Sequence, residues 1–260
     1  MIPYKFNPEE AFNVIKEHWE TWAESVRCNK WVIGISGGKD STVVAALAVR
    51  IFGKENVLGV MLPNHIQDDI SDSIEVCETL EINHITMNIK NVYGAMMQEL
   101  ETNALWKLGI NEASSDTVIN LPPRLRMAAL YAVAQSVGGM VVNTSNRSEN
   151  VVSFSTLYGD HAGSYAPIQD LTVTEVMALG DWLRIPEYLV HKTPVDGLQS
   201  RTDEEKLGIS YAEIDDIIRF DKGSDANKEL VDSYFVRGRF KLDMVRIPGP
   251  EFSFPDFYKS

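Results

Sequence analysis

A short segment rich in glycine and hydroxyl side chains, Ser36-Gly37-Gly38-Lys39-Asp40-Ser41, has the composition of a phosphate-binding loop. Adjacent glycines lack Cβ atoms, so backbone N–H groups can approach a phosphate closely, and Ser36 and Ser41 add hydroxyl donors. A helix that begins near Ser41 would point the positive end of its dipole at the same anion. The segment therefore predicts a polyphosphate site.

Two carboxylates near this loop suggest what else the site must hold. A carboxylate beside a polyphosphate is repulsive unless a cation lies between them, so Asp40 predicts Mg²⁺. Glu149 ends the polar stretch 142–149, which directly follows a predicted strand, and it could face the loop of Asp40. The alternative for Glu149 is an acidic residue in the first turn of a helix, favoured only by the helix dipole.

Two familiar phosphate motifs do not fit the loop. A Walker P-loop needs Ser or Thr after its Gly-Lys pair and a glycine five residues before the second glycine. Here Asp40 follows Gly38-Lys39, and Ile33 stands at the earlier position. The glycines also lack the G-x-G-x-x-G spacing of a dinucleotide-binding fold, so both classes are disfavoured.

Strands and helices alternate along the first 140 residues and would position this loop. The predicted strands span 31–35, 57–62, 84–87 and 140–142, and the predicted helices span about 8–27, 41–52, 68–80, 92–108 and 124–136. The strand segments are continuously apolar, which indicates burial on both faces and hence a parallel sheet between two helical layers.

The sequence thus predicts an α/β fold in a single domain, 1–260, with a doubly wound parallel sheet flanked by helices in a Rossmann-like three-layer arrangement. The core sheet would cover about 30–170, and a C-terminal helical part with a tail would cover about 171–260. Ligands in such sheets bind beyond the carboxyl ends of the strands, where the strand order reverses. The loops after Ile35, Leu62 and Val142 should therefore lie at one edge.

The two ends of the chain carry aromatic and apolar side chains. Residues of the first helix recur at helical spacing, and this stripe is core or subunit interface rather than a cofactor site: Phe12, Ile15, Trp19, Trp22 and Val26. The tail 246–260, rich in Pro and Phe, should dock on the body or on a partner subunit.

Composition limits the class of partner. The 260 residues include 37 acidic and 24 basic side chains, a net charge of −13, so the surface would repel nucleic acid.

Cys28 and Cys77 have no zinc spacing, and two thiols fit a reducing compartment. The first ten residues do not resemble a signal peptide, and no apolar run approaches the roughly 20 residues of a membrane span. We expect a soluble, cytoplasmic protein without nucleic-acid or membrane partners.

The segment Ser-Gly-Gly-Lys-Asp-Ser after a strand resembles the pyrophosphate-binding loop of the ATP pyrophosphatase superfamily. Its members cut ATP between the α and β phosphates, adenylate a substrate oxygen, and let a nitrogen or sulfur nucleophile displace AMP. Further stretches at 142–149, 158–176 and 191–215 are similar, in order and spacing, to the ammonia-dependent NAD synthetase family. The resemblance covers about residues 10–255.

This resemblance implies an enzyme that amidates deamido-NAD. ATP would adenylate the nicotinate carboxylate and release pyrophosphate, and free ammonia would then give NAD and AMP. It also implies Mg²⁺ as cofactor, ATP as co-substrate and a homodimer. The related tRNA thiolases are disfavoured because the chain lacks catalytic cysteines and a basic surface, and 260 residues leave no room for a glutamine-cleaving domain beside the synthetase.

The resemblance assigns roles to individual residues. The implied ATP contacts are Gly34, Ile35, Ser36, Gly37, Gly38, Lys39, Asp40, Ser41, Leu62 and Thr144. Asp40 and Glu149 match the metal ligands, and Arg124, Phe240 and Lys241 fall at deamido-NAD contacts. Asp40 and Asp160 are the implied catalytic residues, and Asp160 belongs to a mobile loop that closes over the reacting carboxylate.

Several positions depart from the family pattern, and most of them fall on nucleotide or dinucleotide contacts: Leu157, Ser164, Val173, Val195 and Phe240. Adenylation is therefore the firmer inference, and an amide ligase of the same chemistry that acts on a different carboxylic acid remains the alternative. A non-catalytic nucleotide-binding module is disfavoured by Asp40. His161 and His191 are expected to be structural or solvated side chains rather than catalytic bases.

Overall fold

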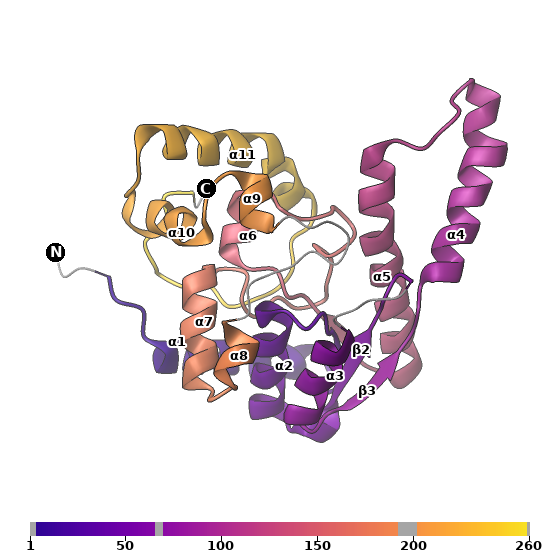
Figure 1. Ribbon diagram of the computed structural model, residues 1–260. Helices are drawn as coiled ribbons and strands as arrows, with labels where there is room; N and C mark the ends of the chain where they lie inside the picture. Colours follow the sequence, from indigo (N-terminus) through magenta and orange to yellow (C-terminus); the bar gives the residue numbers. More distant parts are fainter. Residues whose placement is uncertain (1–3, 66–69, 192–201, 259–260) are drawn as a thin grey trace.

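A four-stranded parallel sheet lies at the centre of the computed structural model, which describes residues 4–65, 70–191 and 202–258 (Figure 1). The strands are β1 (Trp31–Gly34), β2 (Val57–Met61), β3 (Asn83–Thr86) and β4 (Met140–Val142), in the order β3-β2-β1-β4. β1 pairs in parallel with both β2 and β4, so the strand order reverses beside β1. The predicted doubly wound α/β fold is confirmed.

Helices cover the two faces of the sheet unequally. The helices are α1 (Pro8–Val26), α2 (Lys39–Phe52), α3 (Ile70–Thr79), α4 (Lys90–Glu99), α5 (Ser115–Val137), α6 (Arg147–Val151), α7 (Val173–Trp182), α8 (Glu187–Val190), α9 (Asp203–Leu207), α10 (Tyr211–Phe220) and α11 (Asp225–Met244). Trp31 and Ile33 of β1 pack with α1, α2 and α7 in the main core, whereas Val32 faces a smaller cluster with α5. The alternate side chains of β1 thus join two layers of helices.

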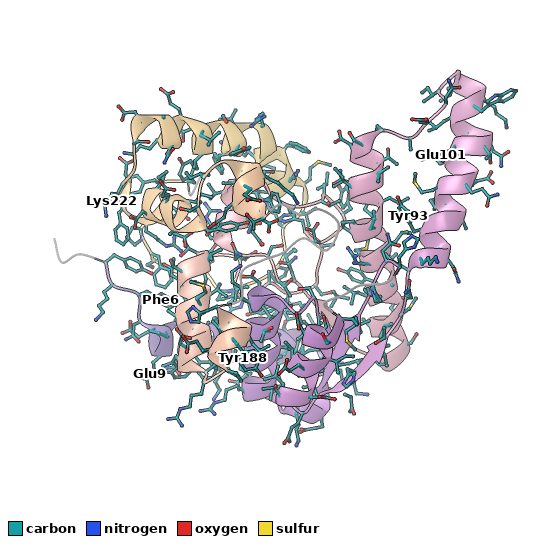
Figure 2. All side chains as sticks on the ribbon, viewed as in Figure 1. Phe6, Glu9, Tyr93, Glu101, Tyr188 and Lys222 are labelled. Atoms are coloured by element: carbon teal, nitrogen blue, oxygen red, sulfur yellow. The ribbon has the colours of Figure 1, made fainter. Side chains whose placement is uncertain are left out.

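The expectation that every strand is buried on both faces is wrong for β3. All four residues of β3 are exposed, and Ile85 keeps 41% of its surface accessible. β3 is the outermost strand, and α4 projects away from the body with the upper part of α5, where Tyr93 and Glu101 mark the arm (Figures 1 and 2). Ile85, the one apolar side chain of β3, therefore does not belong to the core clusters.

The prediction that Pro122-Pro123 opens a helix at 124 is also wrong. α5 begins nine residues earlier, at Ser115, and the Ser114 hydroxyl oxygen caps its first turn. The two prolines lie inside the helix, where they cannot donate to the carbonyls of Val118 and Ile119. Those two residues are 44% and 54% exposed, so water can satisfy the carbonyls that the prolines leave unpaired.

The aromatic stripe of α1 belongs to the core. Phe12, Ile15 and Trp19 are buried, and Trp19 stacks on Tyr165 with ring centroids 4.7 Å apart. Trp31 of β1 meets the same Trp19 edge to face. Of the two alternatives from the sequence, core rather than subunit interface is confirmed.

The tail docks on the body of its own chain. The Ala166 N–H donates to the Pro248 carbonyl, and Asp256 accepts two hydrogen bonds from Arg147, at 2.7 and 3.2 Å. Phe254 packs against Phe6, with centroids 5.9 Å apart. The segments near the two ends of the chain therefore lie against each other.

A buried ion pair ties four segments together. Arg219 of α10 donates to both carboxylate oxygens of Glu175 of α7, each at 2.8 Å, and the Tyr4 hydroxyl donates to the same carboxylate. Arg219 also donates to the Pro255 carbonyl of the tail. Removal of one member of the Arg219–Glu175 pair would leave the charge of the other buried without a partner, which should cost stability.

No helix within 4–65, 70–191 and 202–258 has both the length and the apolar character to cross a membrane. Cys28 and Cys77 are free thiols, as their spacing predicted. Burial raises the pKa of Cys77 to about 11, so this thiol stays protonated near neutral pH.

Replacing Arg219 with methionine should destabilise the fold by about 3–5 kcal/mol, because Glu175 would be left buried without its partner. Urea denaturation followed by tryptophan fluorescence measures this change. Lys54→Met is the matched control, since its partner Glu81 lies with it at the surface, and the urea midpoint should barely move. Equal midpoints for Arg219→Met and the unchanged chain would contradict the role of the buried pair.

Candidate active site

The predicted phosphate loop joins β1 to α2 at the carboxyl edge of the sheet. α2 begins at Lys39, two residues earlier than predicted, so Lys39 and Asp40 lie in its first turn. The residue that precedes the helix, Gly38, has no side chain to cap it. The N–H groups at this helix end are therefore open to an anion, and the helix dipole favours one there.

Gly37 and two serines give the loop its shape. Gly37 has φ 78°, and a Cβ there would lie 3.1 Å from the Asp72 Cβ and 3.2 Å from the Ser73 nitrogen. The hydroxyl oxygens of Ser36 and Ser41 lie 3.2 Å apart, and Ser36 accepts a hydrogen bond from the Gly38 N–H. The loop is thus held in a tight turn that only glycine fits at position 37.

One buried residue, Asn146, links the two predicted carboxylates. Asn146 Nδ2 donates to Asp40 Oδ1 at 3.0 Å, and the Asn146 backbone N–H donates to Glu149 Oε2 at 3.1 Å. Asn146 Oδ1 in turn accepts from the Glu149 N–H at 3.0 Å, which completes a capping box at the start of α6. Both interpretations of Glu149 hold at once: it caps its helix, and it faces the loop of Asp40.

Asn146 is a site residue that the sequence reasoning did not single out. It is fully buried and lies just beyond β4, next to the phosphate loop of β1. The available signal was the spacing Asn146 to Glu149, an N-cap residue followed three positions later by Glu, straight after a strand. What the spacing could not reveal is the partner Asp40, 106 residues away.

Asp40, Glu149 and Lys39 act on one another through their charges. Desolvation and then the charge of Asp40 raise the pKa of Glu149 well above its usual range. Burial alone would lower the pKa of Lys39, but the charges of Asp40, Glu149 and Asp203 outweigh it and raise that pKa. Lys39 Nζ lies 3.2 Å from Asp40 Oδ2. Lys39 therefore only partly offsets the repulsion between the two carboxylates.

The donor set of Asp40 and Glu149 fits Mg²⁺. This ion usually binds through one or two carboxylates and completes its shell with water and substrate phosphates. Among the residues that the structure describes, no group of three or more His, Cys, Asp or Glu side chains could hold a metal. The arrangement thus suits a magnesium ion shared with a nucleotide rather than one caged by protein.

The loop that carries Asp160 packs on the end of β4. Asp160 Oδ1 accepts a hydrogen bond from the Thr156 N–H at 2.6 Å, and its carbonyl accepts one from Asn143 Nδ2 at 3.0 Å. Asp160 is an exposed residue, yet desolvation by the protein around its carboxyl raises its pKa. His161 beside it is buried, and burial together with the charge of Lys241 lowers its pKa.

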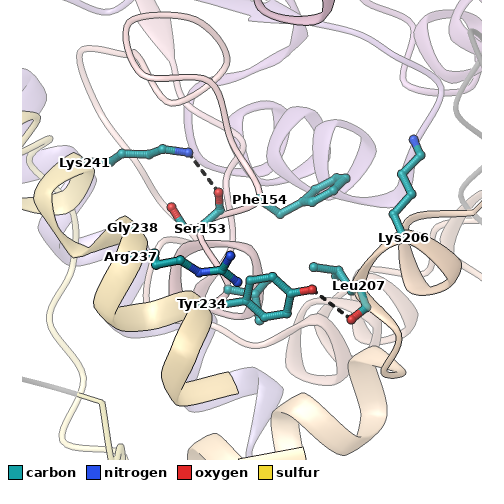
Figure 3. A pocket seen from close by; sticks show the side chains of 9 residues that line it. Ser153, Phe154, Lys206, Leu207, Tyr234, Arg237, Gly238 and Lys241 are labelled. Atoms are coloured by element: carbon teal, nitrogen blue, oxygen red, sulfur yellow. Dashed lines mark hydrogen bonds between the residues drawn. The ribbon is translucent and has the colours of Figure 1, made fainter. Parts of the chain in front are cut away.

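A basic pocket of about 360 Å³ lies between α11, α9 and the end of α6 (Figure 3). Its lining residues are Val152, Ser153, Phe154, Lys206, Leu207, Tyr234, Arg237, Gly238 and Lys241. Lys241 Nζ donates to the carbonyls of Ser153 and Ser155, at 3.0 and 2.6 Å. Three cationic side chains around one pocket favour an anionic ligand, although the chain as a whole is acidic.

The remaining predicted contacts are spread along the same edge and on neighbouring elements. Leu62 and Thr144 follow β2 and β4, and Phe240 is 51% exposed on α11. Arg124 Nε donates to the Leu157 carbonyl at 3.2 Å, which ties α5 to the loop before Asp160.

The motif that begins at His191 is only partly described. Residues 192–195 lie outside the described residues, and Val195 with them. Exposed His191 pairs with Asp181, at 2.9 Å between Nε2 and Oδ1. Of the two alternatives expected for His191, structural or solvated, its exposure favours the solvated one.

A parallel α/β sheet that carries this loop and this carboxylate pair at its carboxyl edge defines an ATP-dependent ligase of the ATP pyrophosphatase type. The family model for NAD synthase matches residues 11–237. The chain therefore belongs to the NAD synthase family.

Similar proteins agree with this membership. An NH(3)-dependent NAD(+) synthetase of Thermococcus sibiricus is 42% identical over 188 residues, which cover 72% of this chain and 70% of the relative. Its counterpart in Alkaliphilus metalliredigens is 37% identical over 84% of this chain and 89% of its own. A structure of an NMN synthetase from Francisella tularensis has a TM-score of 0.79 at 31% identity and covers 94% of this chain and 99% of its own. The predicted family, enzyme class and ATP-using reaction are confirmed.

Gly37→Ala should destabilise the protein by about 1–3 kcal/mol and weaken ATP binding, because the new Cβ would strain the turn against Asp72 and Ser73. Thermal denaturation and ATP titration by calorimetry measure the two effects. Gly94→Ala is the control, since this helical glycine has nothing within 4 Å, and it should leave stability unchanged or raise it by up to about 1 kcal/mol. If both variants melt alike, position 37 does not require glycine.

Proposed function

We propose that this chain amidates the nicotinate carboxylate of deamido-NAD with ammonia while ATP is cleaved to AMP and pyrophosphate. The observation that carries the proposal is the link from Asp40 through Asn146 to Glu149, at the open N-terminus of α2. Paired carboxylates beside a phosphate loop suit a reaction in which pyrophosphate leaves together with a divalent ion.

The first step would be adenylation. The N–H groups of the first turn of α2 and the hydroxyls of Ser36 and Ser41 would orient the β and γ phosphates. Mg²⁺ held by Asp40 and Glu149 would supply charge neutralisation on the departing pyrophosphate. A carboxylate oxygen of the acid then attacks the α-phosphorus, the bond to the bridging oxygen breaks, and an acyl-adenylate and pyrophosphate form.

The second step would be attack of ammonia on the acyl carbon with release of AMP. Asp160 would hold ammonium and accept the proton whose loss makes it ammonia, a role for which a raised carboxyl pKa is suited. The second proton, which the nitrogen loses after attack, would pass to solvent as AMP leaves. The loop 158–164, packed on Asn143, would keep water from the acyl-adenylate. Lys241, Phe240 and Arg124 would contact the acid substrate.

A second candidate substrate is the shorter acid nicotinate mononucleotide. The structure of similar fold from Francisella tularensis is named an NMN synthetase, and its alignment spans nearly the whole of both chains. The departures at Leu157, Ser164 and Phe240 fall on the positions that would contact a dinucleotide. An amide ligase that acts on the mononucleotide would use the same adenylation site.

We also propose that the enzyme works in the cytoplasm. Its two cysteines are free thiols, which fits a reducing compartment. Its substrates under the proposed reaction, ATP and a nicotinate nucleotide, are found there.

We further propose that the chain forms a homodimer through the projecting arm. Apolar side chains gather on β3 and directly after it, on α4 and on the first half of α5, and they are about 40% exposed or more: Ile85, Met87, Val92, Met96, Val118 and Ile119. An exposed apolar surface spread over three elements is typical of a subunit interface. A second copy would cover the face of β3 that this chain leaves open (Figure 1).

The reaction is tested with Mg-ATP, ammonium and either deamido-NAD or nicotinate mononucleotide, by measuring the amide product, AMP and pyrophosphate. One mole each of amide, AMP and pyrophosphate supports the proposed chemistry, and the ratio of kcat/KM for the two acids decides the substrate. Asp40→Asn should lower kcat about 100- to 1,000-fold because pyrophosphate loses charge compensation. Release of ADP and phosphate would reject cleavage between the α and β phosphates.

Ile119→Asp should weaken dimer formation about 100-fold, because it places a charge in the proposed apolar interface. Sedimentation velocity across a concentration series measures the association. The control is Val236→Asp on α11, a residue that is 75% exposed and far from the arm in the fold, and it should not change the association constant. A monomer for the unchanged chain at all concentrations would rule out the dimer.

A further inference from the structure

Lys39 is a cation placed where a helix disfavours one. It is the first residue of α2, and the positive end of the helix dipole repels an ammonium group there. Its side chain is nevertheless buried, with 8% of its surface exposed. Some interaction at the site must therefore compensate both the dipole and the loss of water.

The compensation comes from the predicted metal ligands. Lys39 Nζ lies 3.2 Å from Asp40 Oδ2, while the other oxygen of Asp40 accepts the hydrogen bond from Asn146. The described charges that stabilise the ammonium are those of Asp40, Glu149 and Asp203, and all of them are acidic. The lysine thus sits among the carboxylates that a divalent ion would bind.

An aromatic ring closes the other side of the ammonium. Lys39 Nζ lies 5.6 Å from the centroid of the Tyr211 ring, within the range of a cation–π interaction. Tyr211 is buried at the start of α10, and its hydroxyl has no hydrogen-bond partner among the described residues. The ring, not the hydroxyl, is therefore what this residue offers to Lys39.

We propose that Lys39 is an internal counter-ion: its ammonium neutralises Asp40 and Glu149 while no divalent cation is bound, and metal binding displaces it from Asp40. Tyr211 is the positioning residue that holds the ammonium in this place. The inference rests on the proposed role of Asp40 and Glu149 as metal ligands. It implies that lysine and metal compete, so the protein binds metal less tightly than its carboxylates alone would allow.

The test measures binding of Mn²⁺ alone, as a probe for Mg²⁺, by electron paramagnetic resonance of the free ion at one fixed pH. Lys39→Met should bind Mn²⁺ about 10-fold more tightly than the unchanged chain, because the competing charge is gone. In chelator it should melt about 5 °C or more lower, and Mn²⁺ should raise its Tm more than that of the unchanged chain. Lys39→Arg, which keeps the charge, should bind Mn²⁺ like the unchanged chain.

A second pair of variants covers the case in which Lys39→Met does not fold. Tyr211→Leu removes the ring and should bind Mn²⁺ more tightly, whereas Tyr211→Phe keeps the ring and should not. No gain of Mn²⁺ affinity in any folded variant that loses the charge or the ring would overturn the counter-ion role, even if none of the proteins binds the ion.

Two further variants distinguish failure of the counter-ion role of Lys39 from failure of the proposed metal site. Asp40→Asn and Glu149→Gln should each lose Mn²⁺ binding if these carboxylates are the ligands. Their failure to do so would reject the ligand assignment and the counter-ion with it. Loss of binding in both, together with an unchanged affinity of Lys39→Met, would reject the counter-ion alone.

Discussion

Repulsion between two carboxylates is the constraint around which the site is built. Asp40 belongs to the loop after β1 and Glu149 to the helix after β4, and the fold brings them together because these strands are neighbours. Asn146 fixes the pair, because its side-chain amide donates to the Asp40 carboxylate and its backbone N–H donates to the Glu149 carboxylate. Such an arrangement is unfavourable without a cation, so the sheet and the caps of α2 and α6 hold in place a charge distribution that would not form by itself.

Helices of the C-terminal third of the chain hold α6, which carries Glu149, in place. Ser148, next to Glu149, donates a hydrogen bond to Asp215 of α10, and Asp215 accepts another from the Thr174 N–H of α7. Burial raises the pKa of Asp215 to about 6, so this link between α6, α7 and α10 is itself sensitive to mildly acidic pH. Residues that never touch a substrate thus determine where α6, and with it Glu149, can lie.

What could be predicted from the sequence was encoded locally. The phosphate loop and Asp40 lie within six consecutive residues. Continuous apolar runs predict the buried strands β1 and β2. The rest depends on contacts between distant residues. The partner of Asp40 is 106 positions away, β3 is exposed because of its place at the sheet edge, and Pro122-Pro123 lies within α5 because Ser114 starts the helix earlier. Periodicity and propensity carry no information on such neighbours.

The contact between the segments near the two chain ends couples their local unfolding. Tyr4 and Phe6 pack against Phe254, and Tyr4 also bonds to the carboxylate that Arg219 holds. Fraying of either end would strip the same aromatic cluster and expose the same ion pair, so amides in both should exchange with solvent deuterium as one cooperative unit. The first and last described segments of the enzyme therefore protect each other from exchange rather than loosening independently.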